Sequence, residues 1–380
     1  MSVHLSEDQR LFATALQEFC DREAGDRERL VALRNERHRG HNQDVHQKLA
    51  ELGYVGVSIP EAYGGGGGGA VELCLLIEGI ERGLLPIAGL GVSLIVAGPY
   101  GRFGTEEQKR EILGGICAGH VEAIAMSEPD AGSDVASLTT RAVRTGDDYV
   151  INGQKMWTTA AHVADHLLVV CRTDPSGSKH EGLSMISVPT GTEGLTIRPI
   201  ATMGGSEVNE VFFSDVRVPA DRLLGEENNG WRQLMAGLNH ERLLVAAQGI
   251  GRAQRALDDV VGYIKQRKQF GRTIGSFQSV RHQIADLATM IECTRHFVYG
   301  IARLVDDNPG KTFPREASMA KLQGAEVAKR TTLEAIQLMG GAGYAVEYGM
   351  EGQFRSALAL SIGGGVAEVQ RDIIAKTYGL

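Results

Sequence analysis

The spacing of hydrophobic and polar positions divides the chain into three regions. From residue 5 to 53 and from 70 to 118, apolar residues recur at helical intervals among charged ones. Between about 122 and 225 the pattern changes to short apolar runs separated by turn residues, which is typical of β-strands. From Asn228 the helical interval returns and predicts four or five long helices, at about 228–268, 277–306, 315–340, 346–358 and 365–378.

The distribution of proline supports this division. No proline precedes Pro60, eight lie from Pro60 to Pro219, and only Pro309 and Pro314 follow. Because proline is excluded from helix interiors, the two proline-poor ends should be helical, and the short connections between the C-terminal helices favour an antiparallel bundle. The sequence therefore predicts a mainly α protein with a β middle domain. We expect an N-terminal α-helical domain at 1–121, the middle β domain at 122–226 and a C-terminal α-helical bundle at 227–380.

Turn residues help to place the elements. Asn152-Gly153, within the alternating run YVINGQKMWTT, is a strong hairpin signal. The glycine run Gly64 to Gly69 is not followed by GK[ST], so a flexible turn is expected there rather than a phosphate loop. The remaining strands are expected in the runs DHLLVVCRT, GLSMISVP, LTIRPI and NEVFFSDVRVP.

Composition narrows the possible classes. The chain has 380 residues, 43% hydrophobic and 23% charged, as in an ordinary globular protein. Its net charge of −8 argues against a basic surface for nucleic acid. The sequence contains no run of 18 apolar residues, so no membrane span is predicted. The N-terminus lacks a signal- or transit-peptide pattern, and the five cysteines are scattered without a CxxC pair, so reduced thiols in the cytoplasm are expected. His162 and His166 lack a supporting carboxylate in the sequence pattern, and no metal site is expected.

One carboxylate interrupts an apolar helical face. On a helical wheel Leu234, Leu238, Leu244 and Val245 project within about 60° of Glu241. Removing a carboxylate from water is costly, so such a group is usually paired, protonated or functional. The pattern alone leaves two interpretations open, a core Glu paired with an Arg of a neighbouring helix and a catalytic group.

Two segments of the β region could contact a ligand. AMSEPDAGSD (125–134) offers backbone amides and hydroxyls to an anionic or heteroaromatic group, although an ordinary polar loop would look the same. Trp157-Thr158-Thr159 follows on a strand, where the indole could cover a flat ring system or simply be half-buried.

Together with three C-terminal motifs, these segments resemble the acyl-CoA dehydrogenase family over essentially the whole chain. AMSEPDAGSD and KMWTT resemble its two flavin-binding segments. QRKQFGRTIGSFQ (266–278) and QLMGGAGY (337–344) resemble its cross-subunit flavin contacts, and VQRDIIA (369–375) resembles its C-terminal helix. The resemblance implies the acyl-CoA dehydrogenase fold, with a β-barrel-like middle domain and a four-helix bundle. It also implies non-covalent FAD, an acyl-CoA substrate, an acceptor such as electron-transfer flavoprotein, and a homotetramer built as a dimer of dimers.

The resemblance also carries site residues to positions of this chain. The flavin-binding positions of the first two motifs are Met126, Ser127, Gly132, Ser133, Trp157, Thr158 and Thr159. The positions that reach the cofactor of a neighbouring subunit are Arg267, Gln269, Phe270, Phe277, Gln278, Gln337, Leu338, Gly340 and Gly341. Near the C-terminus, Val366 and Glu368 complete the flavin set, with Val366 in place of the family's usual Thr. The positions along the acyl-CoA are Ser133, Asn239, Arg242 and Gly364.

The family's reaction needs a base for the α-proton, and this chain lacks the commoner one. Many members use a Glu in a Tyr-Glu-Gly-Thr segment, where this chain has Gly363-Gly364-Gly365-Val366. A second group, which includes isovaleryl-CoA and long-chain enzymes, has its base in a Glu-Arg-Leu segment on the first bundle helix. This chain has Glu241-Arg242-Leu243 there, so the resemblance implies that Glu241 is the catalytic base. It further implies that the amide near Gly364 donates to the thioester carbonyl.

Two other functions remain open at this stage. A flavin-dependent acyl-CoA oxidase of the same fold would share these motifs, and so would a non-catalytic partner subunit of a heteromeric dehydrogenase. The sequence does not distinguish CoA from acyl-carrier-protein thioesters, nor does it give the length, branching or ring content of the acyl group.

Overall fold

The computed structural model describes residues 4–34 and 40–380, apart from the side chain of Leu238. The described chain forms two compact units. The helical unit comprises residues up to Leu30, Gly69–Leu85 and Glu241–Leu380, and the sheet unit comprises Val31–Gly68 and Pro86–His240. None of the described helices is both long enough and apolar enough to cross a membrane.

The helices agree with the predicted helical regions. The N-terminal ones are α1 (Glu7–Ala24), α2 (Arg27–Leu33), α3 (Gln43–Glu51), α4 (Ala70–Gly83), α5 (Ala88–Phe103) and α6 (Glu106–Cys117). The C-terminal ones are α7 (Gly230–Gln266), α8 (Gln278–Asp306), α9 (Pro314–Met339), α10 (Gly341–Tyr344), α11 (Met350–Ala359) and α12 (Ala367–Lys376). All five predicted C-terminal helices are present, and only the single-turn α10 was not anticipated.

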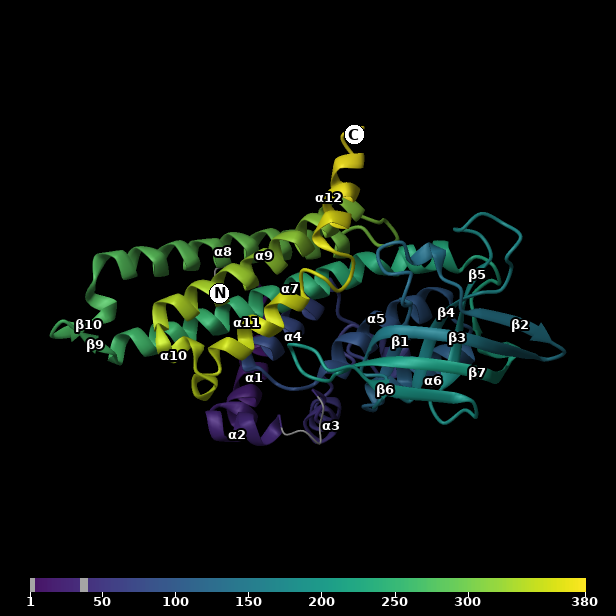
Figure 1. Ribbon diagram of the computed structural model, residues 1–380, viewed down its shortest axis with the longest axis horizontal. Coiled ribbons are helices and arrows are strands. Elements are labelled where there is room, and N and C mark those ends of the chain that lie inside the picture. Colours follow the sequence, from purple (N-terminus) through teal and green to yellow (C-terminus); the bar gives the residue numbers. More distant parts are fainter. Residues whose placement is uncertain (1–3, 35–39) are drawn as a thin grey trace. The chain divides into compact units, whose positions relative to one another are not determined.

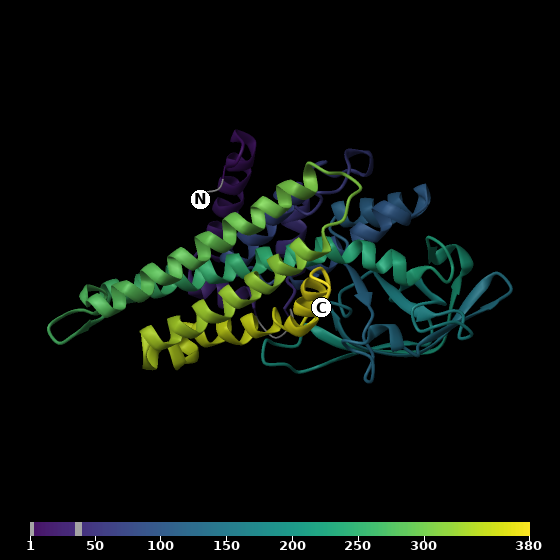
Figure 2. The ribbon, with the colours of Figure 1, turned by 90° about the horizontal axis from the view of Figure 1, so that it is seen from above.

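In the helical unit, α8, α9 and α11 lie along α7, with neighbouring helices antiparallel as predicted (Figures 1 and 2). A close approach joins α7 to α9 through two glycines. A Cβ built on Gly324 would lie 2.6 Å from the Cα of Ala246, and one on Gly249 would lie 2.0 Å from the Gly324 carbonyl oxygen. Close beside this crossing, Val245, Ala325, Ala328, Ala357 and Leu360 form a buried apolar cluster. The two helix backbones therefore meet without intervening side chains.

The sheet unit contains one sheet of eight strands in the order β6-β7-β3-β2-β4-β5-β8, with β1 parallel to β4. Helix α5 packs on β1, and α6 packs on α5. The first four strands are β1 (Glu122–Ala125), β2 (Arg141–Thr145), β3 (Asp148–Thr159) and β4 (His166–Arg172). The others are β5 (Leu183–Pro189), β6 (Leu195–Pro199), β7 (Val208–Pro219) and β8 (Leu223–Leu224).

The predicted hairpin at Asn152-Gly153 is wrong. Strand β3 runs through both residues, and the turn lies earlier, between β2 and β3. The pairing of β3 with β7 shifts between Ile151 and Gly153, so Gly153 occupies a bulge with φ of 150°. The Asn152 side chain bonds both the amide and the carboxylate of Asp215 on β7. The pairing of β3 with β7 therefore places this dipeptide at a bulge within a long strand, although the dipeptide by itself favours a turn.

The glycine run Gly64 to Gly69 forms a turn, as predicted, but a closely packed one. The amides of Gly66, Gly67 and Gly68 donate to carbonyls of the segment 56–59. A Cβ on Gly65 would lie 2.0 Å from the Ile59 carbonyl oxygen. Glycine is therefore required here by close backbone packing rather than by flexibility.

A histidine of the sheet unit should make stability depend on pH. The His46 ring is fully buried beside His41, with 4.9 Å between ring centroids, and neither of its nitrogens has a hydrogen-bond partner in the described chain. Burial lowers the pKa of His46 to about 3. Below about pH 6.5 the unfolded chain binds a proton that the native chain excludes, so stability should fall with decreasing pH by up to about 1.4 kcal/mol per unit.

Urea unfolding at pH 7 and pH 5 tests this expectation. His46→Phe should reduce the difference between the two free energies of unfolding, whereas His282→Gln on α8, where the side chain is exposed, should leave it unchanged. An equal pH dependence in wild type and His46→Phe would contradict it.

Candidate functional site

Glu241 lies on α7 with only 7% of its surface exposed. Leu234, Leu244 and Val245 of the predicted apolar face are also buried. Burial raises the pKa of Glu241, and the positive charges of Arg242 and Lys321 oppose that rise. Glu241 is therefore a buried carboxylate whose ionised form is favoured by two nearby positive charges. It forms no salt bridge with any residue of the described chain. This is the environment that suits a general base near neutral pH.

The glycine turn before α12 faces this carboxylate. Gly364 and Gly365 have φ of 64° and 84°, in the left-handed region that favours glycine. A Cβ on Gly364 would lie 3.3 Å from Glu241 Oε1 and 3.6 Å from Val245 Cγ2. The helix position that carries Glu241 and the loop position at which other members of the resembled family carry their base therefore lie next to each other. The amide of Gly364 donates to no group in the described part of the chain, so it is available to a ligand.

Lys321 adjoins this candidate site and was not singled out from the sequence. It lies on α9 with a fully buried side chain, and its Nζ donates to the Gly365 carbonyl oxygen at 2.7 Å. Burial lowers the pKa of Lys321 to about 8, although the negative charge of Glu241 acts in the opposite direction and raises it. A signal was present in the sequence, because Lys321 interrupts a helical stripe of small residues formed by Ala317, Gly324, Ala325 and Ala328.

The predicted substrate residues lie on different parts of the fold. Arg242 is 7% exposed, and burial lowers its pKa while Glu241 opposes that change. Asn239 on α7 is 9% exposed. Ser133 lies on the exposed loop after β1, together with Gly132. The structure thus brings Gly364 to Glu241, and it places Ser133 and Asn239 in the sheet unit.

The two predicted flavin segments are joined inside the sheet unit. The Met156 amide donates to the Ser127 carbonyl oxygen at 2.8 Å. The buried Lys155 Nζ donates to the Met126 carbonyl oxygen and to Glu128 Oε1, each at 2.8 Å. A charged side chain fixed at 0% exposure therefore ties the loop after β1 to strand β3.

Trp157 presents a flat surface from β3. Its indole is 55% exposed, and its φ of 61° lies where the β3–β7 pairing is irregular. A bulky residue in the left-handed region is unusual and is found mainly where surrounding structure fixes it. Thr158 is buried, and its Oγ1 has no partner among the residues described, while Thr159 is half-buried.

The other predicted flavin residues lie in the helical unit and are mostly exposed. Strands β9 (Lys268–Gln269) and β10 (Arg272–Thr273) form a hairpin at whose tip Phe270 is 93% exposed. The Phe277 ring lies edge-on to Phe270 and under the Arg272 guanidinium, 4.0 Å away. Also exposed are Arg267, Gln269, Gln278, Gln337, Gly340 and Gly341. Leu338 is half-buried, as is Val366 at the start of α12, and Glu368 is exposed in its first turn.

The histidine pair has a different environment from the one expected. His166 Nδ1 lies 3.1 Å from Glu122 and Nε2 lies 3.6 Å from Glu111, so the expectation that no carboxylate accompanies it is wrong. His162 instead contacts Asn209. Within the described chain, no three His, Cys, Asp or Glu side chains are grouped so as to hold a metal ion.

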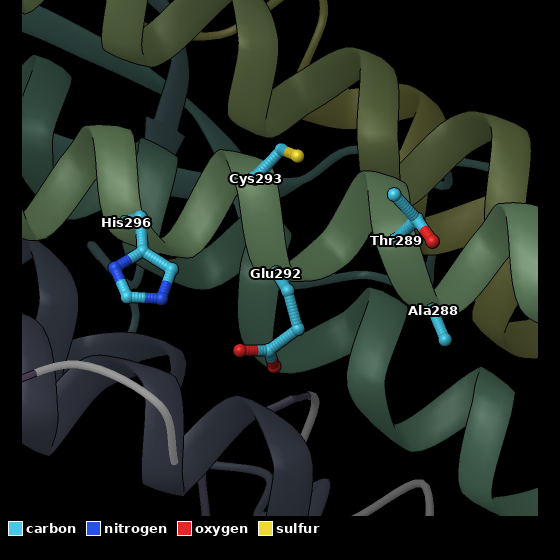
Figure 3. A pocket seen from close by; sticks show the side chains of 5 residues that line it. All are labelled: Ala288, Thr289, Glu292, Cys293 and His296. Atoms are coloured by element: carbon cyan, nitrogen blue, oxygen red, sulfur yellow. The ribbon is translucent and has the colours of Figure 1, made fainter.

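An open hollow on α8 is separate from these residues (Figure 3). It is lined by Ala288, Thr289, Glu292, Cys293 and His296. Figure 3 shows that all five project from one helix, and Glu292 also pairs with Arg295. None of these residues contributes to the site around Glu241.

Comparison with known proteins identifies the family. Models of the N-terminal, middle and C-terminal domains of acyl-CoA dehydrogenases match residues 6–120, 123–216 and 228–379. A probable acyl-CoA dehydrogenase of Bacillus subtilis, YngJ, is 37% identical over 382 residues, covering 99% of each chain. The chain belongs to the acyl-CoA dehydrogenase family.

Two further similar proteins cover most of the chain. The subunit CarC of the caffeyl-CoA reductase-Etf complex of Acetobacterium woodii is 36% identical over 339 residues, covering 88% of this chain and 89% of its own. The crystal structure of acyl-CoA dehydrogenase from Geobacillus kaustophilus superposes with a TM-score of 0.93 at 35% identity, covering 100% of both chains. The predicted three-domain fold is confirmed, and the protein is an FAD-dependent oxidoreductase that acts on CH–CH bonds of acyl-CoA.

The residues present fit FAD. The exposed Trp157 indole offers a surface for a flat ring system, and the adjoining Ser127 segment is held in place by bonds from β3. In the helical unit, the exposed guanidinium of Arg267 suits a pyrophosphate.

Proposed function

We propose that the protein removes the α-proton of an acyl-CoA thioester with Glu241, giving the trans-2-enoyl-CoA. The observation that supports this most directly is the approach of Gly364 to the Glu241 carboxylate, since the loop position has no carboxylate of its own. The buried setting makes Glu241 a stronger base than an exposed Glu, while Arg242 and Lys321 favour its ionised form. FAD held by the segments around Ser127 and Trp157 would supply the acceptor for the β-hydrogen, which leaves as hydride.

The Gly364 amide should assist the proton transfer. Removal of the α-proton places enolate-like charge on the thioester oxygen, and a fixed donor aimed at that oxygen lowers the barrier. The unpaired amide, beside the base and on a turn held from two sides, is suited to this role. Arg242, Asn239 and Ser133 are proposed to contact the substrate.

The remaining assignments follow the family. Met126, Ser127, Gly132, Ser133 and Trp157 to Thr159 are proposed to hold FAD, with Val366 and Glu368 near it. The exposed residues from Arg267 to Gln278 and from Gln337 to Gly341 are proposed to reach the cofactor of another subunit in a homotetramer. We further propose an electron-transfer flavoprotein as acceptor, as the name of the CarC complex suggests, a cytoplasmic location, and domain boundaries at 1–121, 122–226 and 227–380.

Bleaching of the flavin under anaerobic conditions tests the function and the substrate range. Gly364 lacks the side chain that a loop base would place there, so extended or branched acyl groups should be accommodated. We expect long or branched acyl-CoAs to exceed butyryl-CoA in kcat/KM across a panel from short to steroid-sized substrates. An optimum at four straight carbons would refute the substrate range, and absence of bleaching with every thioester would refute the function.

Arg267→Ala should lose FAD and loosen the oligomer together. The guanidinium is exposed in the chain and is proposed to pair with the pyrophosphate of a neighbouring subunit's cofactor, so binding and assembly are linked by mass action. Flavin absorbance per chain and light scattering measure the two effects. Lys265→Ala, an exposed cation in the last turn of α7 and two residues before Arg267, is the control. Full flavin content and native size in Arg267→Ala would place Arg267 away from the cofactor.

A further inference from the structure

The ammonium of Lys321 is buried without a direct ionic partner. Its side chain is 0% exposed, and no carboxylate of the described residues lies within salt-bridge distance of it. Its one hydrogen bond among the described residues goes to the Gly365 carbonyl oxygen, at 2.7 Å. Burying an ammonium in this way is costly, and replacement by an apolar side chain of similar length would remove that cost. A contribution to folding alone therefore does not explain a lysine here.

The hydrogen bond fixes the turn that faces Glu241. Gln370 Nε2 donates to the carbonyl oxygens of Gly364 and Gly365, each at 3.1 Å. Lys321 and Gln370 thus hold the glycine turn from α9 and α12. Three consecutive glycines would otherwise sample many conformations. With both carbonyls held, the free Gly364 amide keeps one direction beside the Glu241 carboxylate.

The charge of Lys321 acts on the same site. Lys321 and Arg242 both favour the ionised form of Glu241. Lys321 also interacts favourably with Glu368 on α12. Arg242 shares α7 with Glu241 and stays in place when Lys321 is changed, so the contribution from α9 can be measured separately.

We propose that Lys321 is a positioning residue for the reaction, holding the Gly363–Gly365 turn through the Gly365 carbonyl and favouring ionised Glu241 by its charge. The effect on the ionisation of Glu241 rests on the proposed role of Glu241 as base. The effect on the conformation of the turn does not depend on that role.

Three variants separate the two contributions. Lys321→Gln keeps a donor and removes the charge, Lys321→Met removes both, and Gln370→Leu removes the second anchor while leaving the charge. Lys329→Met changes a lysine two turns further along α9 whose side chain is 38% exposed, and it serves as the control. Flavin content and melting temperature are recorded for each.

The pH profile of kcat/KM and amide hydrogen exchange are the deciding measurements. In Lys321→Gln and Lys321→Met the acid limb should move up by about one pH unit, which is the effect of losing a nearby opposite charge. At pH 7, kcat of Lys321→Met should fall about tenfold with KM changed less than about twofold. Exchange at the amides of Gly363 and Ala367, which donate to Ala359 and Ser361 at the two ends of the turn, should accelerate in Lys321→Met and Gln370→Leu. Gln370→Leu and Lys329→Met should keep the wild-type acid limb.

A lowered melting temperature with an unchanged acid limb and unchanged exchange would show that Lys321 is structural only, and would overturn the proposal. If Lys321→Met does not fold, the proposal is decided by the acid limb of Lys321→Gln and by the exchange rates in Gln370→Leu, with the same outcomes for and against it. Failure of the proposed function is recognised separately. If Glu241→Gln retained full activity, Glu241 would not be the base, and exchange at the amides of Gly363 and Ala367 would still decide whether Lys321 holds the turn.

Discussion

Glu241→Gln should slow flavin reduction by about 10²–10⁴-fold, the usual loss when a general base is removed. The amide keeps the shape of the carboxylate and is tolerated in a site that is 7% exposed, but it cannot accept the α-proton. FAD content and affinity for a substrate analogue should therefore stay near the wild-type values. Anaerobic stopped-flow spectroscopy with saturating acyl-CoA measures the rate.

The matched control is Asp258→Asn, the same chemical change at an exposed position of α7. It should leave flavin reduction unchanged. Undiminished reduction in Glu241→Gln would mean that Glu241 is a buried structural carboxylate.

The loop position offers a test by rescue. In Glu241→Gln, the further change Gly364→Glu should restore part of the rate, because its Cβ would start 3.3 Å from the position of Glu241 Oε1. Recovery should be incomplete, since a non-glycine residue at φ of 64° costs about 1–2 kcal/mol and a 1 Å misplacement can cost about 10²-fold.

Gly324→Leu should destabilise the protein by about 3 kcal/mol or more, at the upper end of overpacking effects. A Cβ at this position meets the backbone of Ala246 at 2.6 Å, and backbone cannot move aside as a side chain can. The helices α7 and α9 would have to separate, which would also displace Glu241 from Lys321. Thermal unfolding followed by circular dichroism should show the loss, with weaker flavin retention.

Gly262→Ala on α7 is the control, because no atom lies within 4 Å of its added Cβ. Alanine should stabilise the helix there by about 0.5–1 kcal/mol. Equal melting temperatures for Gly324→Leu and wild type would show that the two helices are not fixed by this contact.

The sequence indicated those candidate site residues whose signal lies in the local pattern. Glu241 was recognisable because a carboxylate in an apolar helical face is rare, and Gly364 because a motif lacked its usual side chain. Lys321 was missed because its burial depends on α7 and α12, which are distant along the chain. A lysine among small residues gives only a weak signal of this kind.

The misplaced hairpin at Asn152-Gly153 has a similar cause. The dipeptide has strong local turn preferences, but pairing along β3 and β7 uses Gly153 as a bulge instead. Likewise, the sequence placed the glycines at 64–69 in a turn but did not show that the turn is closely packed. The packing depends on carbonyl groups of residues 56–59, which accept hydrogen bonds from the glycine amides only once the chain has folded.

The meeting of Glu241 and Gly364 also limits how this family can exchange its base during evolution. A chain that first loses one carboxylate before gaining the other passes through an inactive state. A chain that gains the second first has two carboxylates a few ångströms apart, of which one stays protonated and the other remains able to act. In the proposed mechanism, an exchange of the base between helix and loop keeps activity throughout only if it passes through chains with both carboxylates, so such chains should be active rather than defective.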